Sequence, residues 1–399
     1  MGNSSLSQRV QEMTESATIA MSQKSRAMTE KGLDVISLSI GQPDFNTPDI
    51  IKEAAKTAID ENYSKYTPVG GFLPLRQAIA DKLKRENNLE YSTDEISVST
   101  GAKQAIINVI LSLVNPGDEV ILPAPFWVSY IEQIKFAGGI PVVIPTKIEN
   151  NFKVTTEELS SSITHKTKLI IYSSPCNPSG SVYTSKELNS IAIEVAKHKN
   201  TFILSDEIYE YINFTNDSTS IASFPVIKEQ VITVNGVAKG FAMTGWRIGY
   251  AAGPSWLIKA CNKIQGQFTS GANSIAQRAC ITALNEGEKV SIQMKASFLR
   301  RRNLMHDLIQ GIPGIKTNKP NGAFYLFPDV SSFFGKSTSD TTISNANDLC
   351  EYLLSDALVA LVSGAAFGAP NCIRISYASA DEVLTEACIR IKKSLSKLK

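Results

Sequence analysis

The sequence predicts an α/β protein that has a large, doubly wound, mostly parallel sheet and a second, smaller α+β domain. Short apolar strands alternate with helical stretches between about residues 96 and 235, a pattern typical of a sheet covered by helices on both faces. From about residue 288 onward the pattern becomes a long helical stretch, strands at 322–327, 358–362 and 372–376, and a closing helix at 381–395. The length of 399 residues allows two or three packed units.

The composition indicates a globular enzyme: hydrophobic residues are 43% and charged residues 20% of the chain. The net charge of +2 is spread along the sequence, so we expect no nucleic-acid and no membrane partner. Six scattered cysteines without a Cys-x-x-Cys pair, and an N-terminus without an apolar signal core, predict reduced thiols and a cytoplasmic protein. Only three histidines occur, far apart, and we expect no metal site.

The N-terminal third begins with a polar arm, and an amphipathic helix is predicted around Ile19 to Met28. An apolar strand, Val35 to Ile40, then ends at Gly41 and Pro43. Glycine lets a ligand approach the backbone closely, although a plain turn is the simpler interpretation. Tyr66 follows in a turn-rich loop, where a lone tyrosine is usually a packing residue, before a helix that begins near Leu73.

The predicted sheet is made of short apolar segments. They are Ile96 to Ser99, Glu119 to Leu122, Pro141 to Ile144, Leu169 to Tyr172, Phe202 to Leu204 and Val231 to Val234. Gly101, Ala102 and Lys103 open the helix after the first of them. Small residues at a helix N-terminus leave backbone N–H groups available for a phosphate. This is a generic anion site.

Lys239 lies among small residues after the strand Val231 to Val234, and Arg247 follows eight positions on. A lysine in a tight, partly apolar pocket has a lowered pKa and becomes nucleophilic, so it can condense with an aldehyde. An arginine nearby suits a phosphate. An aldehyde and a phosphate on one small molecule describe pyridoxal phosphate.

Two further segments follow predicted strands and suit the same cofactor. Asp206 can keep a ring nitrogen protonated, and Tyr209 can reach the ring oxygen from the same turn. Asp206 could instead cap a helix, and Glu207 could take the role in its place. Asn177 can donate to the ring oxygen and to a substrate carboxylate, although a rigid proline turn, with a cis bond to Pro178, would explain the segment equally.

Two more side chains are candidates on weaker grounds. Trp127 could stack on a cofactor ring or simply pack in the core. Arg374 lies in the apolar strand Cys372 to Ser376. It either faces solvent or is buried with a partner, because an arginine is seldom buried alone.

These motifs together resemble the class I aminotransferases of fold type I, and most closely their bacterial-type aspartate aminotransferase branch. The resemblance is carried by residues 236–249, with Gly-x-Arg-x-Gly after the lysine, by Gly-x-Pro-Asp-Phe at 41–45, by Asn-Pro-Ser-Gly at 177–180 and by Asp-Glu-x-Tyr at 206–209. It covers about residues 30 to 395. The chain departs from the family at Cys176, where Asn is frequent, and at Ser363, where Pro is usual.

The resemblance implies an aminotransferase in which Lys239 is the catalytic residue. It implies three domain segments: 1–45 (arm and part of the small domain), 46–287 (large, cofactor-binding) and 288–399 (small). The implied cofactor-binding residues are Tyr66, reaching across a homodimer, Gly101, Ala102, Lys103, Trp127, Asn177, Asp206, Tyr209, Lys239 and Arg247. The implied substrate-binding residues are Gly41, Lys103, Trp127, Asn177 and Arg374, with Arg9 as a further candidate.

For the substrate, we expect an acidic amino acid, aspartate or glutamate, and a 2-oxo acid. No arginine occurs between Thr269 and Asn273 to bind a distal carboxylate, so Lys103 is the candidate, as in the branch that the chain resembles. With Arg9 it would also admit prephenate. A solvated lysine at a helix start and a charge on a disordered arm are the plain alternatives.

Other functions remain open at this stage. A pyridoxal-phosphate-dependent carbon–sulfur β-lyase, or an aminotransferase of aromatic or neutral specificity, would need nearly the same residues. A transcriptional regulator with a related sensor domain would need a DNA-binding domain, for which there is no room before Gly41. A dehydrogenase is disfavoured because no Gly-x-Gly-x-x-Gly follows a strand.

Overall fold

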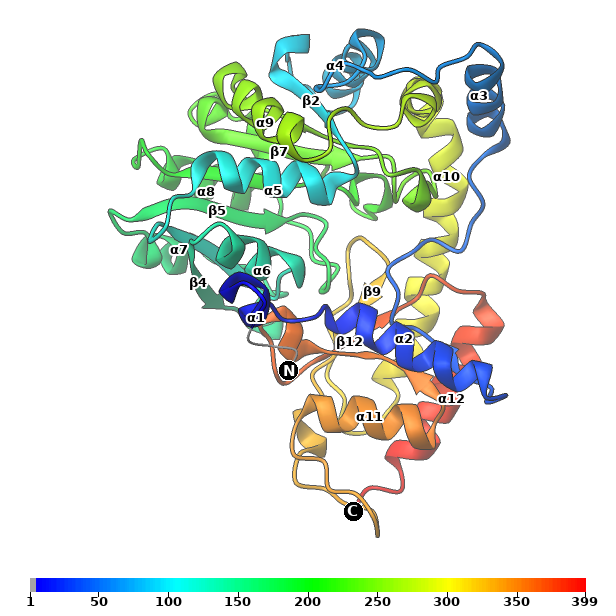
Figure 1. Cartoon of the computed structure of the whole chain (residues 1–399). Helices are drawn as coiled ribbons and strands as arrows, with labels where there is room; N and C mark the ends of the chain where they lie inside the picture. The colour runs from blue at the N-terminus through cyan, green and yellow to red at the C-terminus, as the bar shows by residue number, and fades with distance from the viewer. Residues whose placement is uncertain (1–4) are drawn as a thin grey trace.

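The computed structural model describes residues 5–399, apart from the side chain of Glu288. Residues 1–4, the start of the predicted segment 1–45, lie outside the described residues. Figure 1 shows a large sheet flanked by helices in the upper part of the molecule, and a smaller group of helices and short strands below it. The predicted α/β fold with a mostly parallel sheet is confirmed.

The large sheet has seven strands in the order β2-β8-β7-β6-β5-β3-β4. The strands are β2 (Ile96–Ser99), β3 (Glu119–Ala124), β4 (Ile140–Pro145), β5 (Thr167–Ser173), β6 (Phe202–Asp206), β7 (Val231–Gly236) and β8 (Gly249–Ala252). Only β8 runs antiparallel to its neighbours, and the other pairs are parallel. The sequence did not predict β8, because four residues of Gly, Tyr and Ala carry little strand signal.

Side chains on the two faces of this sheet enter two hydrophobic cores. On β5, Ile170 joins one core, while Leu169 and Ile171 join the other, as the period of two along a strand requires. The first core includes α4 (Leu73–Asn87), α7 (Thr156–Ser162) and α8 (Ser185–Val195). The second core includes α5 (Ala102–Leu113), α6 (Ser129–Phe136) and α9 (Ser255–Phe268).

The smaller group is built on two short sheets. Strands β11 (Val362–Ser363), β12 (Ile373–Ser376) and β9 (Tyr325–Leu326) form an antiparallel sheet, and β1 (Ile36–Ser37) pairs in parallel with β10 (Val359–Ala360). The single strand expected at 358–362 is therefore divided between two sheets. The helices of this group are α2 (Ala17–Glu30), α11 (Ala346–Asp356) and α12 (Asp381–Leu395), whereas the short helix α1 (Gln8–Glu12) lies beside α6 of the large group.

The long helix α10 (Ser274–Gln310) connects the two groups, and in Figure 1 it runs from the upper part of the molecule into the lower one. It packs against α3 (Asp49–Asp60) and α4 above and against α12 below. It begins earlier than the sequence predicts, because the Asn273 side chain accepts a hydrogen bond from the Ala276 N–H at 2.8 Å and caps its start. The predicted boundary between 287 and 288 falls inside this helix and stays a prediction.

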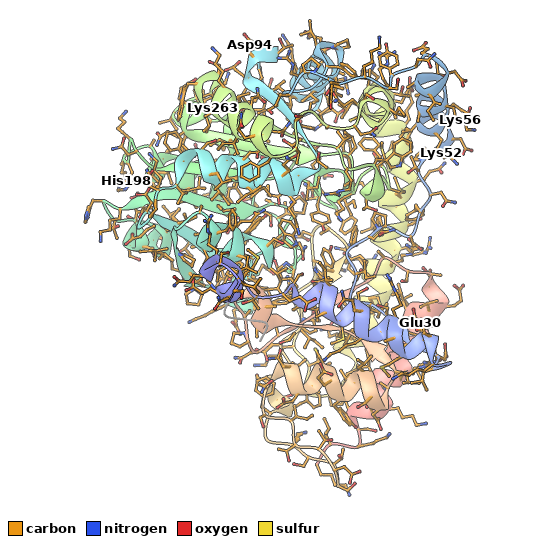
Figure 2. All side chains as sticks on the ribbon, in the orientation of Figure 1. Glu30, Lys52, Lys56, Asp94, His198 and Lys263 are labelled. Atoms are coloured by element: carbon orange, nitrogen blue, oxygen red, sulfur yellow. The ribbon has the colours of Figure 1, made fainter. Side chains whose placement is uncertain are left out.

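Several long polar side chains project from the periphery of the molecule. Figure 2 labels several that project outward, among them Lys52 and Lys56 on α3, His198 after α8 and Lys263 on α9. Among residues 5–399, no helix has the length and apolar character needed to cross a membrane.

Candidate active site

A cavity of about 300 Å³ lies where the carboxyl ends of the central strands meet the smaller group. Ser173 and Asp206 end β5 and β6, and Lys239 follows β7. Tyr325 of β9 and Arg374 of β12 close the other side. Ligands in open α/β sheets bind at the carboxyl ends of the strands, so this cavity is the candidate site.

Lys239 is half-buried, and its Nζ donates a hydrogen bond to the Gly41 carbonyl oxygen at 2.6 Å. Burial, and then the positive charges of Arg374 and Arg247, lower the pKa of Lys239 to about 8, while the negative charge of Asp206 opposes them. A lysine with this pKa carries a substantial neutral fraction near neutral pH, and the neutral amine is nucleophilic.

Asp206 is 5% exposed, and both of its carboxylate oxygens accept hydrogen bonds. The Tyr130 hydroxyl donates to Oδ2 at 2.6 Å, and the Ile208 N–H donates to Oδ1 at 3.2 Å. Burial raises the pKa of Asp206 to about 6, against these hydrogen bonds and the charge of Lys239. Tyr209 lies beside it, with its hydroxyl 2.7 Å from the Tyr325 hydroxyl.

Arg374 is 1% exposed. Its guanidinium donates to Asn177 Oδ1 at 2.9 Å and to the Ser39 carbonyl oxygen at 2.6 Å, and it stacks over Tyr325 and Phe367. Its Nε is buried and makes no hydrogen bond to the described residues. A buried cation held only by neutral groups is poised to bind an anion. The bond between Asn177 and Pro178 is cis.

Arg247 lies beside the N-terminus of α5, close to Gly101 and Ala102. Its guanidinium donates to the Thr244 and Thr100 carbonyl oxygens at 3.0 and 3.5 Å. Gly101 has φ +81°, and a Cβ there would come within 2.3 Å of Arg247 Nη2. The arrangement brings a guanidinium and the first N–H groups of a helix together, which suits a phosphate.

Lys103 and Trp127 line the mouth of the cavity. Lys103 Nζ lies 4.9 Å from the Trp127 ring centroid, within range of a cation–π interaction. Partial burial, and then the charge of Arg247, lower the pKa of Lys103, although the side chain still reaches solvent.

The cavity carries an excess of positive charge. Its lining includes the four cations Lys103, Lys239, Arg247 and Arg374 and a single carboxylate, Asp206. Among the described side chains, none of these cations lies within 4.0 Å of a carboxylate oxygen. Such a site fits a ligand with several negative charges.

The structure brings most of the predicted residues to this cavity. Those that line it are Gly41, Ala102, Lys103, Trp127, Asn177, Asp206, Tyr209, Lys239, Arg247 and Arg374. Gly101 is buried directly behind it, against Arg247. Arg9 is outside: it lies on α1, with its guanidinium 5.7 Å from the Phe136 ring centroid. Tyr66 is also outside and is 100% exposed.

Sequence reasoning missed two tyrosines that line the cavity, Tyr130 and Tyr325. Tyr130 could have been found, because it follows Trp127 by three residues at a helix start, and residues three apart share a helix face. Tyr325 lies in an apolar strand, where the sequence gives no sign of the hydroxyl's partner.

A family described as "Aminotransferase class I and II" matches residues 33–391. The chain belongs to this family. A bifunctional aspartate aminotransferase and glutamate/aspartate-prephenate aminotransferase of Petunia hybrida is 48% identical over 401 residues, covering 99% of this chain and 84% of that protein. A probable aspartate/prephenate aminotransferase of Rickettsia typhi is 46% identical, covering 98% of this chain and 99% of that protein.

Solved structures of the same family have the same fold. The aspartate aminotransferase of Rhizobium meliloti has a TM-score of 0.95 at 39% identity, covering 99% of both chains. The Thermus thermophilus aspartate aminotransferase with maleate has a TM-score of 0.92 at 39% identity, covering 98% of this chain and 99% of that one. The predicted class I resemblance and fold type I architecture are therefore confirmed.

Class I and II aminotransferases in general depend on pyridoxal phosphate. The residues present fit this group on two observations: the unpaired cations of the cavity, and the close approach of the Gly101 backbone to Arg247, which a Cβ would obstruct. The donor set thus matches a molecule that carries a phosphate and a ring oxygen.

Proposed function

We propose that this chain is a pyridoxal-phosphate-dependent aspartate aminotransferase, which moves the amino group between an acidic amino acid and a 2-oxo acid. The observation that carries the proposal is the cavity itself, where three cations without carboxylate partners, Lys103, Arg247 and Arg374, surround the Lys239 amine, whose pKa is about 8. The donor and acceptor bind one after the other, because each needs the same Arg374 and Lys239.

The cofactor would be held by residues from several elements. Arg247 and the α5 N-terminus, with Gly101 and Ala102, would bind the phosphate. Asn177 and Tyr209 would donate to the ring oxygen, Asp206 would pair with the ring nitrogen, and Trp127 would stack on the ring. When bound, pyridoxal phosphate supplies an electron sink for the pair of electrons left when the substrate α-proton departs.

Two side chains would act on the amino acid. Arg374 binds the α-carboxylate, because its buried guanidinium has no anionic partner among the described residues. Lys239 Nζ accepts the α-proton and later returns it, since a pKa of about 8 allows both directions near neutral pH. The Gly41 carbonyl, which accepts from Lys239 at 2.6 Å, orients the amine.

Acidic specificity would come from Lys103. It stands at the cavity mouth above Trp127, where its flexible side chain can meet a distal carboxylate. The relatives named above are aspartate and aspartate/prephenate aminotransferases, so we propose that prephenate is also accepted. In the present structure Arg9 lies outside the cavity, and its proposed part in binding prephenate would require α1 to move.

Lys103→Ala is expected to lower kcat/KM for aspartate by about 30-fold or more, because bound substrate would cover Lys103, and truncating one partner of a buried charge pair typically costs about 2–5 kcal/mol. Turnover of alanine should change little. The measurement is kcat/KM for both donors. Lys263→Ala, which removes a cation from the surface labelled in Figure 2, is the matched control. An equal loss for all donors would instead assign Lys103 to cofactor binding.

The proposed function is tested by half-reactions of the purified protein. Aspartate, glutamate, alanine and phenylalanine are each mixed with the enzyme loaded with pyridoxal phosphate, and the cofactor absorbance is followed. Fast conversion is expected for the two acidic donors, with renewed turnover only when a 2-oxo acid is added. A carbon–sulfur β-lyase would turn over without a 2-oxo acid and release sulfide or a thiol.

We also propose a homodimer in which the partner subunit's Tyr66 contacts the cofactor phosphate. Tyr66 is 100% exposed, and the neighbouring Thr67 bonds the Ala272 carbonyl oxygen beside the end of α9, where Phe268 is 68% exposed. Sedimentation is expected to give a dimer of twice 43.4 kDa, and Tyr66→Phe should weaken cofactor binding. A fully active monomer would contradict this proposal.

The remaining proposals concern organisation and location. We propose that segments 1–45 and 288–399 form the small domain and 46–287 the large one, in keeping with a hydrophobic core of the smaller group most of whose residues belong to the first two segments. A cytoplasmic location is supported by six free, buried cysteines.

A further inference from the structure

We propose that Tyr130 is a positioning residue that acts through Asp206: its hydroxyl holds the Asp206 carboxylate in one orientation and in its ionised form. The inference rests on the proposed function, because its consequence is the affinity of the site for the protonated pyridine ring. It concerns a residue that does not itself need to touch the substrate.

The contact is direct and enclosed. Tyr130, in the first turn of α6, is 0% exposed, and its hydroxyl lies 2.6 Å from Asp206 Oδ2. The backbone N–H of Ile208 occupies Oδ1 at 3.2 Å. With one donor on each oxygen, the plane of the carboxylate is determined before any ligand arrives. A charge-assisted hydrogen bond of this kind is short and strong.

The phenol is itself held rigidly. Its ring meets Trp127 edge-on, with centroids 5.5 Å apart and an interplanar angle of 85°. Its other sides are packed in the second hydrophobic core of the large sheet, which also contains Leu122 and Ile134. A side chain packed in this way has no other rotamer available at low cost, so its hydroxyl can act as a fixed donor.

The surroundings of Asp206 show why such a donor is needed. Burial raises the pKa of Asp206 to about 6, and the Tyr130 hydrogen bond and the charge of Lys239 oppose that rise. The other titratable groups that face this region are the Cys176 thiol and the Tyr209 phenol. Burial and the neighbouring Asp206 charge raise the pKa of Tyr130 well above its ordinary value, so its hydroxyl remains a donor.

Without the Tyr130 hydroxyl, the pKa of Asp206 would rise, and the carboxyl would be neutral over more of the physiological range. The ionised form of Asp206 predominates at pH values above the Asp206 pKa and is lost as the pH falls through that pKa. Removing a donor that favours the ionised form therefore moves this loss to higher pH. The pairing with a protonated ring nitrogen weakens over the same range.

The test is equilibrium binding of pyridoxal phosphate to the apoprotein, followed by tryptophan fluorescence between about pH 5 and 8.5, a range that includes the Asp206 pKa of about 6 and its expected rise in the variant. In Tyr130→Phe we expect Kd to rise about 10- to 100-fold, which corresponds to losing a hydrogen bond to a charged group. We also expect the acidic limb of the affinity profile to move to higher pH.

Tyr183→Phe is the matched control. Tyr183 is 6% exposed, and its hydroxyl accepts the Val154 N–H at 3.0 Å, away from Asp206. The Tyr183→Phe protein also loses a buried tyrosine hydroxyl, but its Kd for pyridoxal phosphate and its pH profile are expected to stay as in the wild type. In an Asp206→Asn background, Tyr130→Phe should add no further loss, which isolates the pair even where one variant is less stable.

Three outcomes would overturn the inference. A Tyr130→Phe protein with the Kd and pH profile of the wild type would do so. Equal losses of affinity for pyridoxal phosphate in Tyr130→Phe and Tyr183→Phe would also overturn it. The third such outcome is that Tyr130→Phe causes the same loss of affinity in the wild-type and the Asp206→Asn backgrounds. Failure of the wild-type protein to bind pyridoxal phosphate would be distinguishable from these, because it would overturn the proposed function and the inference with it.

Discussion

Lys239→Ala is expected to lower kcat by about 100- to 10,000-fold, the range typical for removal of a general acid–base group. The reason is that Lys239 Nζ is the cavity amine with a pKa near neutrality, at about 8, and it lies 2.6 Å from the Gly41 carbonyl oxygen. Borohydride reduction of the loaded wild-type protein, followed by peptide mapping, should place the pyridoxyl group on Lys239.

Lys103→Ala is the control for that experiment, because Lys103 is the other lysine named in the lining of the cavity. In this variant the pyridoxyl group should still be found on Lys239. A pyridoxyl group on Lys103, or on any other lysine, would contradict the assignment. The rate of attachment to the apoprotein should rise with pH through about 8, where the Lys239 amine becomes neutral. An ordinary lysine, with a pKa near 10.4, would show this rise only about two units higher.

The second large effect is expected at Arg374. Arg374→Ala should lower kcat/KM by about 30-fold to a few thousand-fold for every amino donor, since losing one partner of a buried charge pair typically costs about 2–5 kcal/mol. The loss is general because the α-carboxylate is common to all donors. Lys103→Ala, by contrast, should affect only the acidic ones. The measurement is kcat/KM for aspartate, glutamate and alanine.

Arg374→Lys controls for packing, because Arg374 also stacks on Tyr325 and Phe367 and bonds Asn177 and Ser39. Lysine keeps the charge but cannot donate bidentately, so we expect an intermediate loss. Melting of both variants separates a folding defect from a binding defect. Unchanged kcat/KM in a stably folded Arg374→Ala protein would remove Arg374 from the substrate site.

Much of this protein could be predicted from its sequence, because its most specific signals are local. The strands Ile96–Ser99 and Val231–Gly236 follow from short apolar runs bounded by turn residues. The final helix, Asp381–Leu395, begins and ends at the predicted residues. The early start of α10 was missed because the capping role of Asn273 depends on one side-chain rotamer.

The candidate site was partly predictable for the same reason. Asp206 ends one strand and Lys239 follows the next, and parallel strands bring their carboxyl ends to one edge of a sheet. Arg374 could be assigned only by resemblance, since its own strand allowed either a solvent-facing or a buried side chain. Its 1% exposure is a result of packing between β12, Tyr325 and Phe367.

By itself the sequence determined the class of fold, the order of most of the elements and the residues able to hold a phosphate, an aldehyde and a carboxylate, because these depend on local patterns and side-chain chemistry. The tertiary structure alone decided which side chains meet across the cavity. Tyr130 and Asp206 are 76 positions apart, and Lys239 and Gly41 are 198 apart. Their contacts, and the pKa values of Asp206 and Lys239, arise from burial and proximity in space, which no local pattern encodes.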